Sequence, residues 1–294
     1  MTDLKLTEIR HPTRTGQADF DALVGIDGHK AALVDELTLV LDRERFTAWA
    51  KMHHPSGLGI LNRLKAKAPL VLLSGEVGCG KTALASCVAT PVARALDKEV
   101  LCLETPSDIR GGGHVGELST RITDAFAQAR AKAAAVGRAI LVIDEADDLA
   151  TSRSQSQAHH EDRAGVNVLI KQIDQLARDK APLAVIMITN REDVLDPAVL
   201  RRSALRLHFA RPDDVMRGIV FRHMLEDTGV SDADVSKLVK ASKRDTPYSI
   251  SDLTDRIGRL ALRRAWKENQ PFDSSFVADA IAEVEPTPLL EKRD

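Results

Sequence analysis

The sequence predicts an α/β domain built on a parallel sheet, followed by a smaller all-helical domain. Short apolar runs of strand length alternate with segments whose apolar residues follow helical spacing, which favours a parallel sheet covered by helices on both faces. A glycine-rich segment follows the first of these runs and opens a helix. Beyond residue 211 no run resembles a strand. We therefore expect a flexible tail at 1–19, an α/β domain at 20–212 and a helical domain at 213–294.

The N-terminal part of the chain changes from polar to periodic near residue 20. Residues 1–19 are polar and contain the breakers His11-Pro12 and Gly16, which indicates a loose tail. Residues 30–50 carry apolar side chains on one helical face and predict a single helix. Residues 53–59 then break this helix with a proline and two glycines.

Five strands and the helices between them make up the expected α/β domain. The expected strands are 70–73, 100–103, 139–143, 184–188 and 205–209. Their apolar character along nearly the whole length indicates burial on both faces. Apolar spacing also predicts helices, which are expected at 118–129, 166–177, 215–226, 232–242, 250–266 and 276–284.

The composition excludes several classes of protein. Lys and Arg total 41 against 43 Asp and Glu in 294 residues, so the net charge of −2 excludes a uniformly basic coat for nucleic acid. Aromatic residues make up only 3%, which argues against base stacking as the main chemistry. No apolar run approaches the roughly 20 residues that span a bilayer, and the first residues lack a signal-peptide core. We expect a soluble, cytoplasmic protein.

Neither the cysteines nor the histidines are spaced as metal ligands. The three cysteines, Cys79, Cys87 and Cys102, form no Cys-x-x-Cys or Cys/His pattern, which indicates reduced thiols. The histidine pairs at 53–54 and 159–160 lie in polar segments without a third ligand at helical or strand spacing. We expect no metal at either pair.

The segment GEVGCGKT at residues 75–82 predicts a phosphate-binding loop. It fits the pattern G-x-x-x-x-G-K-[ST], and it lies between a strand and a helix as the pattern requires. Glycines let backbone N–H groups surround a phosphate, and the helix N-terminus adds its positive dipole. Lys81 would hold the β- and γ-phosphates, while the Thr82 hydroxyl can bind Mg²⁺. The expected nucleotide-binding residues are Gly75, Glu76, Val77, Gly78, Cys79, Gly80, Lys81, Thr82 and Ala83. The alternative is a plain glycine turn.

A buried strand at 139–143 ends in two carboxylates, Asp144 and Glu145. In an open parallel sheet, ligands bind at the carboxyl ends of the strands. Asp144 can reach a Mg²⁺ ion beside Thr82, and Glu145 can polarise a water for attack on the γ-phosphate. The alternative is a helix N-cap or a solvated turn.

Two further polar features follow the next predicted strand. Asn190 stands at its end, where it can hydrogen-bond the attacking water or the γ-phosphate, although an asparagine there also suits a turn. Arg201 and Arg202 follow shortly after. They are either solvated surface residues or a group supplied to the nucleotide of a neighbouring subunit, which is worth about 10³–10⁵ in turnover.

Taken in order, these motifs resemble an AAA+ ATPase module over about residues 20 to 285. The resemblance implies that 75–82 is the Walker A motif, Ile140–Glu145 the Walker B motif, Asn190 sensor 1, and the two arginines the arginine fingers. It also implies that Gly25 and Ile26 pack on adenine. Members of this family form ring hexamers with ATP between the large domain of one subunit and the arginines of the next, so a homo-hexamer is expected here.

The run Val166–Asp174 is similar to the same helix in the pachytene-checkpoint-type remodellers. Those enzymes unfold or convert HORMA-domain proteins, and small bacterial relatives accompany HORMA proteins and nucleotide-cyclase-like enzymes in anti-phage signalling operons. The resemblance therefore implies a HORMA-domain partner for this chain. Residues 247–253 lack the sensor-2 arginine that the remodellers carry, and resemble the general AAA pattern instead.

The family resemblance also implies loops that grip a threaded substrate. The matching stretch is Gly113–Glu117, in which His114, Val115 and Gly116 stand where the family usually has an aromatic residue ahead of a Gly-Glu pair. Residues 151–163 are polar and would form a second pore-facing loop. An ordinary glycine-rich loop and plain disorder are the respective alternatives.

Together these features favour an ATP-driven motor that remodels proteins, with ATP and Mg²⁺ as its cofactors. The first alternative is a nucleic-acid ATPase of the helicase-loader or clamp-loader type, which the charge balance and the few aromatic residues argue against. A switch that binds but does not hydrolyse ATP is the second alternative. The full set of catalytic residues argues against such a switch.

Overall fold

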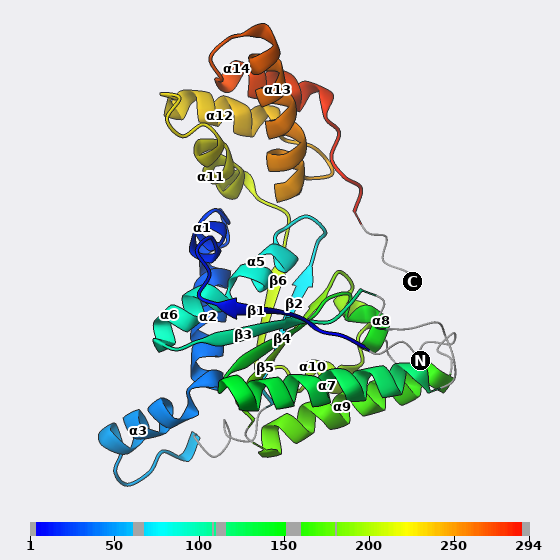
Figure 1. The fold of residues 1–294 in the computed structure, drawn as a ribbon. Coiled ribbons are helices and arrows are strands. Elements are labelled where there is room, and N and C mark those ends of the chain that lie inside the picture. The colour runs from blue at the N-terminus through cyan, green and yellow to red at the C-terminus, as the bar shows by residue number, and fades with distance from the viewer. Residues whose placement is uncertain are drawn as a thin grey trace. The chain divides into compact units, whose positions relative to one another are not determined.

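The computed structural model describes residues 4–60, 68–107, 109, 116–150, 160–179 and 181–289, with the side chains of 160–163 left aside. The chain divides into two compact units. The α/β unit comprises residues 1–21, 28–74 and 82–208, and the helical unit comprises residues 22–27, 75–81 and 209–294. Figure 1 shows the sheet and helices of the first unit and the helices of the second.

The α/β unit is built on a sheet with the strand order β1-β3-β4-β5-β2-β6. The strands are β1 (Thr7–His11), β2 (Leu70–Gly75), β3 (Val100–Glu104), β4 (Ala139–Ile143), β5 (Leu183–Thr189) and β6 (Leu205–Phe209). Strands β3, β4, β5 and β2 pair in parallel. Backbone bonds from Ala204 to Leu70 and from Glu76 to Phe209 show that β6 runs parallel to β2. All five predicted strands are therefore confirmed, and so is the α/β fold.

Helices cover both faces of this sheet. They are α1 (Gly16–Asp21), α2 (Asp27–Leu41), α3 (Arg43–His53), α5 (Lys81–Cys87), α6 (Ala89–Leu96), α7 (Glu117–Val136), α8 (Asp147–Ala150), α9 (His160–Asp179) and α10 (Pro197–Leu200), with a 3₁₀ turn η1 (Glu192–Val194). Leu141 and Ile143 of β4 share one apolar core with α7 and α9, and the alternate residues Ile140 and Val142 are buried on the opposite face. Figure 1 shows α2, α5 and α6 on that other side. Burial on both faces explains why these strands are apolar throughout.

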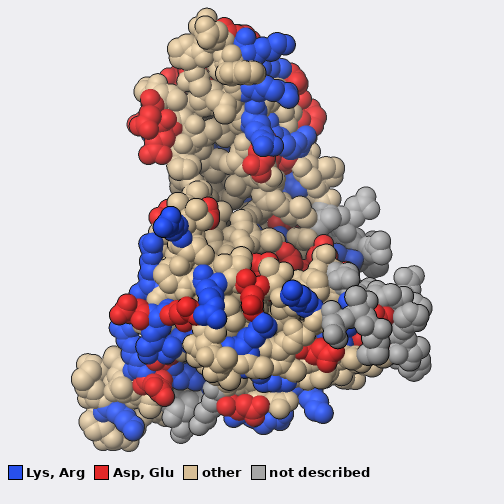
Figure 2. All heavy atoms as spheres, viewed as in Figure 1, with Lys and Arg blue, Asp and Glu red and all other residues tan. Residues whose placement is uncertain are grey.

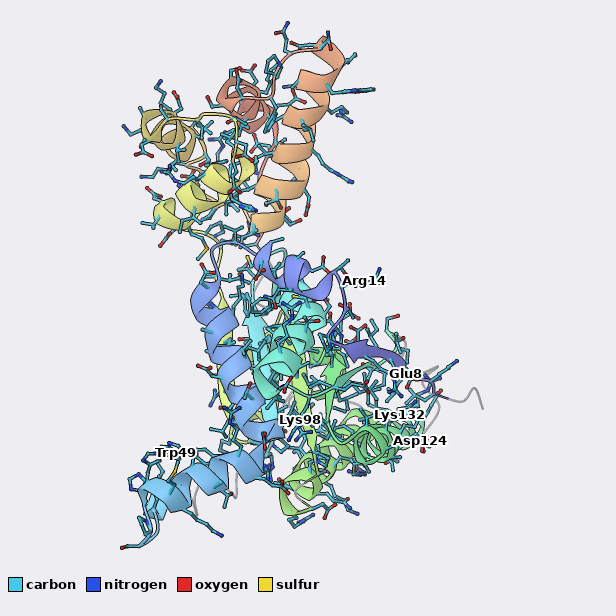
Figure 3. All side chains as sticks on the ribbon, turned by 60° about the vertical axis from the view of Figure 1, so that its left-hand side comes forward. Glu8, Arg14, Trp49, Lys98, Asp124 and Lys132 are labelled. Carbon is cyan, nitrogen blue, oxygen red and sulfur yellow. The ribbon has the colours of Figure 1, made fainter. Side chains whose placement is uncertain are left out.

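The prediction of a loose tail at residues 1–19 is wrong for the described residues 4–19. Residues 7–11 form the edge strand β1, which pairs antiparallel with β3. Lys132 of α7 hydrogen-bonds Glu8 of β1, and Figure 3 shows these two side chains close together. The buried His11 bonds the Thr90 hydroxyl through Nδ1 at 2.8 Å. Backbone pairing and these anchors order a segment whose polar composition suggested a tail.

The single helix predicted at residues 30–50 is divided into α2 and α3. The break falls at Asp42, whose carboxylate accepts a hydrogen bond from the Arg45 amide at 3.2 Å and caps the N-terminus of α3. Helix α3 then carries the stacked rings of Phe46 and Trp49. Trp49 is labelled on this helix in Figure 3.

The helical unit has an apolar core of its own. Its helices are α11 (Asp214–Met224), α12 (Asp232–Ala241), the π-helical segment η2 (Asp252–Gly258), α13 (Arg259–Glu268) and α14 (Ser274–Glu283). Phe221, Leu253 and Ile257 are fully buried between them. Tyr248 is also buried, and its hydroxyl donates to the Val284 carbonyl at 2.5 Å. The predicted all-helical character of this part of the chain is confirmed. Among the described residues, no helix is long and apolar enough to cross a membrane.

A buried carboxylate, Asp252, joins η2 to the end of the chain. Its oxygens accept hydrogen bonds from the Ser249 amide, the Arg256 guanidinium and both the amide and the hydroxyl of Thr287. Burial alone would raise the pKa of Asp252, but the hydrogen bonds from Thr287, Ser249 and Arg256 outweigh it and hold the pKa well below the usual 3.8. The ionised form is therefore the one that the fold stabilises.

We expect Asp252→Asn to lower the free energy of unfolding by about 1–3 kcal/mol at pH 7, because the amide cannot accept all of these hydrogen bonds. A carboxylate with a lowered pKa stabilises the fold above its unfolded pKa of 3.8 and loses that contribution as the pH falls further. The difference in the free energy of unfolding between the wild type and the variant, measured by urea titration, should therefore become smaller below pH 3.8. An equal gap at pH 3 and pH 7 would contradict this assignment.

Candidate functional site

The segment Gly75–Lys81 of the helical unit is a loop with three glycines at positive φ, Gly75, Gly78 and Gly80. Gly75 has φ +120°, and a Cβ atom there would lie 2.2 Å from the Phe209 carbonyl oxygen. Gly78 has φ +72°, and a Cβ atom would lie 2.8 Å from the Ser249 hydroxyl. Both positions therefore require glycine, for conformation and for space. A side chain at either position would clash with β6 or with the turn at Ser249, so the glycines let the loop pack closely against both.

Lys81 lies inside this loop and is only 5% exposed. Its ammonium group donates to the carbonyl oxygens of Gly75 at 2.8 Å and of Glu76 at 2.6 Å. A buried positive charge held by neutral carbonyl groups can stabilise an anion that enters the loop. The geometry fits a phosphate chain, and Lys81 supplies the charge.

An apolar hollow of about 400 Å³ opens beside Gly80 within the helical unit. Its lining is Ala22, Leu23, Val24, Ile26, Gly80, Val220, His223, Met224, Ile250 and Thr254. Gly25 has φ +79° and stands against Met216. Small-molecule sites are typically hollows of this size with apolar walls and a few polar groups. The lining suits the flat apolar face of a purine, with His223 and Thr254 as the polar groups.

In the α/β unit, Thr82 and Asp144 form a polar pair at the end of β4. The Thr82 hydroxyl donates to one Asp144 oxygen at 2.8 Å, and the Glu145 amide donates to the other at 2.8 Å. Hydroxyl and carboxylate oxygens are the ligands that Mg²⁺ prefers. The donor set therefore fits a Mg²⁺ ion that keeps several waters.

Glu145 is exposed and has φ +51°, a left-handed conformation that is uncommon for residues other than glycine. Holding it there costs on the order of 1–3 kcal/mol, and such residues gather at active sites. The next amide, that of Ala146, donates to the Ile188 carbonyl at 2.8 Å and fixes the turn against β5. The Glu145 carboxylate is thus presented to solvent at the end of the strand.

The end of β5 lies next to this turn. β4 and β5 pair in register with Ile143 opposite Met187, so Asn190 emerges at the same edge of the sheet as the β4 carboxylates. Asn190 is exposed, while the preceding Thr189 is buried and donates to Asp147 at 2.7 Å. The structure therefore brings Thr82, Asp144, Glu145 and Asn190 to one edge of the sheet.

The two adjacent arginines of the α/β unit have different surroundings. Arg202 forms a bidentate pair with Asp174 of α9 at 2.6 and 2.9 Å, and its third bond goes to the Ala198 carbonyl. The hydrogen bond from Arg202 lowers the pKa of Asp174 and keeps that carboxylate ionised. Arg201, the C-cap of α10, is exposed. Arg202 is therefore hydrogen-bonded to residues of its own chain, whereas Arg201 is exposed to solvent.

Comparisons with known proteins decide the family. Residues 71–212 match the family described as "ATPase family associated with various cellular activities (AAA)". The chain is 36% identical over 300 aligned residues to CD-NTase-associated protein 6 of Escherichia coli strain MS 115-1. The alignment covers 97% of this chain and 95% of that protein. The chain belongs to this family of AAA ATPases. It is therefore an ATP-binding enzyme that hydrolyses ATP.

Solved structures agree with this assignment. A chain of the Escherichia coli MS115-1 HORMA:CdnC:Trip13 complex is 35% identical and superposes with a TM-score of 0.89 over 98% of both chains. Rhizobiales Trip13 is 31% identical, with a TM-score of 0.74 over 96% of this chain and 98% of that one. The resemblance to the pachytene-checkpoint-type subfamily, inferred from residues 166–174, is confirmed.

Several expected features of this AAA ATPase fall on parts of the chain that are not described. His114 and Val115 lie outside the described residues, as do 151–159. Gly116 is described and forms the N-cap of α7 with φ +80°. Residues 160–163 belong to α9, so the expected loop is shorter than 151–163 at its C-terminal end. Among the described residues, no group of three or more His, Cys, Asp and Glu side chains could hold a metal ion, so the carboxylate of Asp144 and the Thr82 hydroxyl are the candidate ligands.

Sequence reasoning missed parts of the site that come from the helical unit. Val220 and Met224 of α11 line the apolar hollow, but their helical spacing shows only that they face a core. Arg211 was also not predicted, although it forms an ion pair with Glu76 of the loop.

The cysteine of this loop, Cys79, is 1% exposed, and burial raises the pKa of its thiol. Cys79 therefore remains a protonated, packed side chain.

Proposed function

We propose that this AAA ATPase is a protein-remodelling motor that acts on a HORMA-domain protein and thereby regulates a bacterial antiviral signalling complex. The observation that carries the proposal is the similarity, over 98% of both chains, to a chain solved in a HORMA:CdnC:Trip13 complex. CD-NTase-associated protein 6 matches over a similar length, which supports a place beside a nucleotide-cyclase-like enzyme. The free thiols support a reducing, cytoplasmic location.

The nucleotide is held by two groups of residues. The loop Gly75–Lys81, with Thr82 and Ala83 after it, binds the triphosphate through backbone N–H groups and the Lys81 charge. Gly25 and Ile26 belong to the segment that lines the apolar hollow, where adenine packs. Thr82 and Asp144 would hold Mg²⁺, which supplies charge neutralisation on the phosphates.

Hydrolysis needs a positioned water. Glu145 accepts a proton from that water as it attacks, because its carboxylate is exposed at the end of β4 on a constrained backbone. Asn190 orients the water or the γ-phosphate from the neighbouring strand end. The negative charge that develops on the γ-phosphate is stabilised by an arginine from the next subunit, Arg201 or Arg202.

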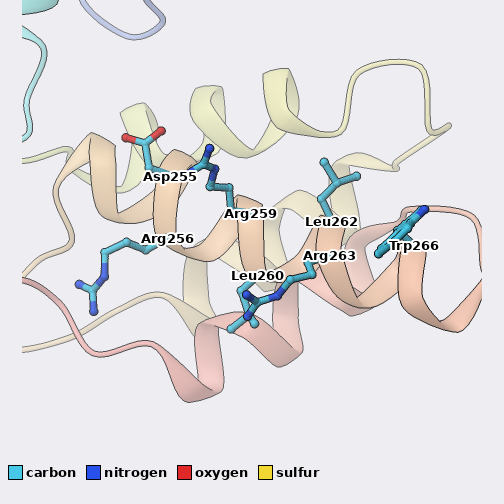
Figure 4. A pocket seen from close by; sticks show the side chains of 7 residues that line it. All are labelled: Asp255, Arg256, Arg259, Leu260, Leu262, Arg263 and Trp266. Atoms are coloured by element: carbon cyan, nitrogen blue, oxygen red, sulfur yellow. The ribbon is translucent and has the colours of Figure 1, made fainter.

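A homo-hexameric ring provides that neighbour. The outer face of η2 and α13 carries a hollow of about 600 Å³, and its lining residues are Asp255, Arg256, Arg259, Leu260, Leu262, Arg263 and Trp266 (Figure 4). Trp266 is 79% exposed and Leu262 is 56% exposed. Exposed apolar surface of this kind is typical of an interaction site, and we include it among the surfaces that the ring covers.

Protein is favoured over nucleic acid as the substrate. Figure 2 shows basic and acidic side chains interspersed over the α/β unit, and the run of basic side chains on the helical unit has acidic side chains beside it. A nucleic-acid ATPase needs an excess of basic side chains to neutralise phosphates, and the net charge of −2 provides none. We propose that the pore-loop residues His114, Val115 and Gly116 contact the threaded protein.

The test is disassembly of a HORMA-domain protein from its cyclase-like partner. The complex is incubated with the wild-type chain or with Lys81→Ala in Mg-ATP and followed by size-exclusion chromatography. We expect the wild type to separate the two partners and Lys81→Ala to leave them together, because the variant lacks the charge that holds the phosphates. ATPase stimulation by DNA but not by the HORMA protein would overturn the proposal in favour of a nucleic-acid ATPase.

A further inference from the structure

The last described residues of the chain return to the nucleotide-binding loop. We call residues 284–289, which follow α14, the C-terminal strap. The strap has no regular secondary structure, yet four of its carbonyl oxygens accept hydrogen bonds from side chains of the helical unit. These acceptors are Val284, Glu285, Thr287 and Pro288. An irregular segment bound at four points along its length is held in one conformation rather than loosely attached.

The first anchor of the strap is Asp252. Thr287 donates to it twice, from its hydroxyl at 2.6 Å and from its amide at 3.1 Å. Asp252 is only 1% exposed, so its carboxylate is largely removed from water, and hydrogen bonds to a charged group in such surroundings are strong. The same carboxylate accepts from the Ser249 amide, and the Ser249 hydroxyl accepts from the Asp252 amide. Asp252 therefore joins the strap to the turn at Ser249.

The second anchor is Arg211, whose side chain is 4% exposed. Its guanidinium donates to the carbonyl oxygens of Thr287 at 2.6 Å, Pro288 at 2.9 Å and Pro247 at 2.6 Å. These three acceptors fix the plane of the guanidinium. Carbonyl groups carry no net charge, so a buried arginine bound only to them would lack a counter-ion.

Glu76 supplies that counter-ion. The Arg211 Nε and a Glu76 carboxylate oxygen lie 3.4 Å apart, and both atoms are buried. Glu76 is the second residue of the nucleotide-binding loop, and its carbonyl accepts from Lys81. The turn that Asp252 holds contacts the same loop, because the Ser251 amide donates to the Gly78 carbonyl at 2.9 Å. Two series of contacts therefore connect Thr287 of the strap with the loop. One runs through Arg211 and Glu76, and the other runs through Asp252 and the turn at 249–251.

We propose that Arg211 is a positioning residue of the nucleotide-binding loop, and that the docked C-terminal strap holds it in place. Arg211 acts through Glu76 and touches no substrate. Two of the three carbonyls that orient its guanidinium toward Glu76, those of Thr287 and Pro288, belong to the strap, and the third is that of Pro247. Strap docking and nucleotide binding are therefore coupled, and each strengthens the other by the same factor. This inference rests on the phosphate-binding role proposed for residues 75–81.

The coupling is tested first with variants of Thr287, measured as binding of methylanthraniloyl-ATP to the full chain. Thr287→Val keeps the volume but loses the hydroxyl bond to Asp252, and we expect its Kd to rise about fivefold. Thr287→Ser retains the hydroxyl and should bind like the wild type. Thr228→Val is the control, because it removes the hydrogen bond from the hydroxyl of the exposed Thr228 to the Leu225 carbonyl elsewhere in the helical unit.

Arg211→Lys gives the second measurement. The lysine keeps the charge but cannot reach Glu76 and three carbonyls at once, so we expect Kd and KM for ATP to rise about five- to tenfold with kcat close to that of the wild type. Arg222→Lys, at an exposed ion pair with Asp232, is the matched control. A loss of kcat without a change in KM would contradict a positioning role.

The reciprocal effect needs no variant. Hydrogen exchange of the Thr287 amide, which donates to Asp252, should slow when ATP binds the wild-type chain. Exchange that is the same with and without ATP would overturn the proposal, as would wild-type affinity in both Thr287→Val and Arg211→Lys. Lys81→Ala distinguishes a failure of the proposed coupling from a failure of the proposed phosphate-binding role of residues 75–81. If Lys81→Ala also binds normally, the phosphate-loop assignment itself is wrong.

Discussion

Replacing Glu145 by Gln is expected to lower kcat for ATP hydrolysis by about 10²–10⁴-fold while ATP affinity stays within about twofold of the wild type. The amide has nearly the shape of the carboxylate but cannot accept a proton from the attacking water. Binding is retained because the loop at 75–82 holds the triphosphate without help from Glu145. Phosphate release measured beside methylanthraniloyl-ATP binding separates the two effects.

The control for this variant is Glu99→Gln, which removes another carboxylate of the α/β unit, one paired with Arg10 at the surface. We expect Glu99→Gln to hydrolyse ATP at the wild-type rate. Glu145→Gln should also retain the HORMA-domain partner in Mg-ATP, because the loaded state no longer turns over. Hydrolysis at the wild-type rate by Glu145→Gln would remove Glu145 from the mechanism.

The double variant Arg201→Ala/Arg202→Ala is expected to lose about 10³–10⁵ in kcat, the contribution of an arginine that stabilises the transferred phosphoryl group. By the free-energy scale of reaction rates, this loss corresponds to roughly 4–7 kcal/mol. Steady-state hydrolysis at saturating ATP measures it. A fall of less than tenfold would show that neither arginine reaches a nucleotide.

The single variants then divide the two roles. Arg202→Ala leaves Asp174 without its bidentate partner, so we expect a lower thermal midpoint, with a loss of about 1 kcal/mol or less because the pair is about one third exposed. Arg201→Ala breaks no such pair and should melt like the wild type. The single variant that reproduces the catalytic loss of the double variant identifies the arginine that acts in trans.

The sequence predicted best those features that depend on the residues of one short segment, such as the loop at 75–82 and the buried strands. The loop at 75–82 was predicted because its glycines are dictated by backbone geometry, and the structure has positive φ at Gly75, Gly78 and Gly80. The buried strands were predicted because a strand covered on both faces must be apolar throughout. The role of each of these residues stays a prediction until the variants are measured.

Other features depend on tertiary contacts that leave little trace in sequence. The edge strand β1 was missed because four of its five residues are exposed, and charged side chains such as Glu8 and Arg10 resemble a tail. The break between α2 and α3 was missed because Asp42 acts as a cap inside an otherwise continuous helical pattern. Arg211 was missed because its partners come from distant segments of the chain.

The most direct measurement mixes two inactive proteins, Glu145→Gln and Arg201→Ala/Arg202→Ala. If ATP is hydrolysed between two copies of the chain, the double arginine variant supplies an intact Glu145 and its Glu145→Gln neighbour supplies the arginines. Random assembly at equal concentrations then restores a complete site at about a quarter of the positions in a head-to-tail ring. We expect the mixture to recover hydrolysis in that proportion. A mixture as inactive as its two components would contradict a site shared between copies.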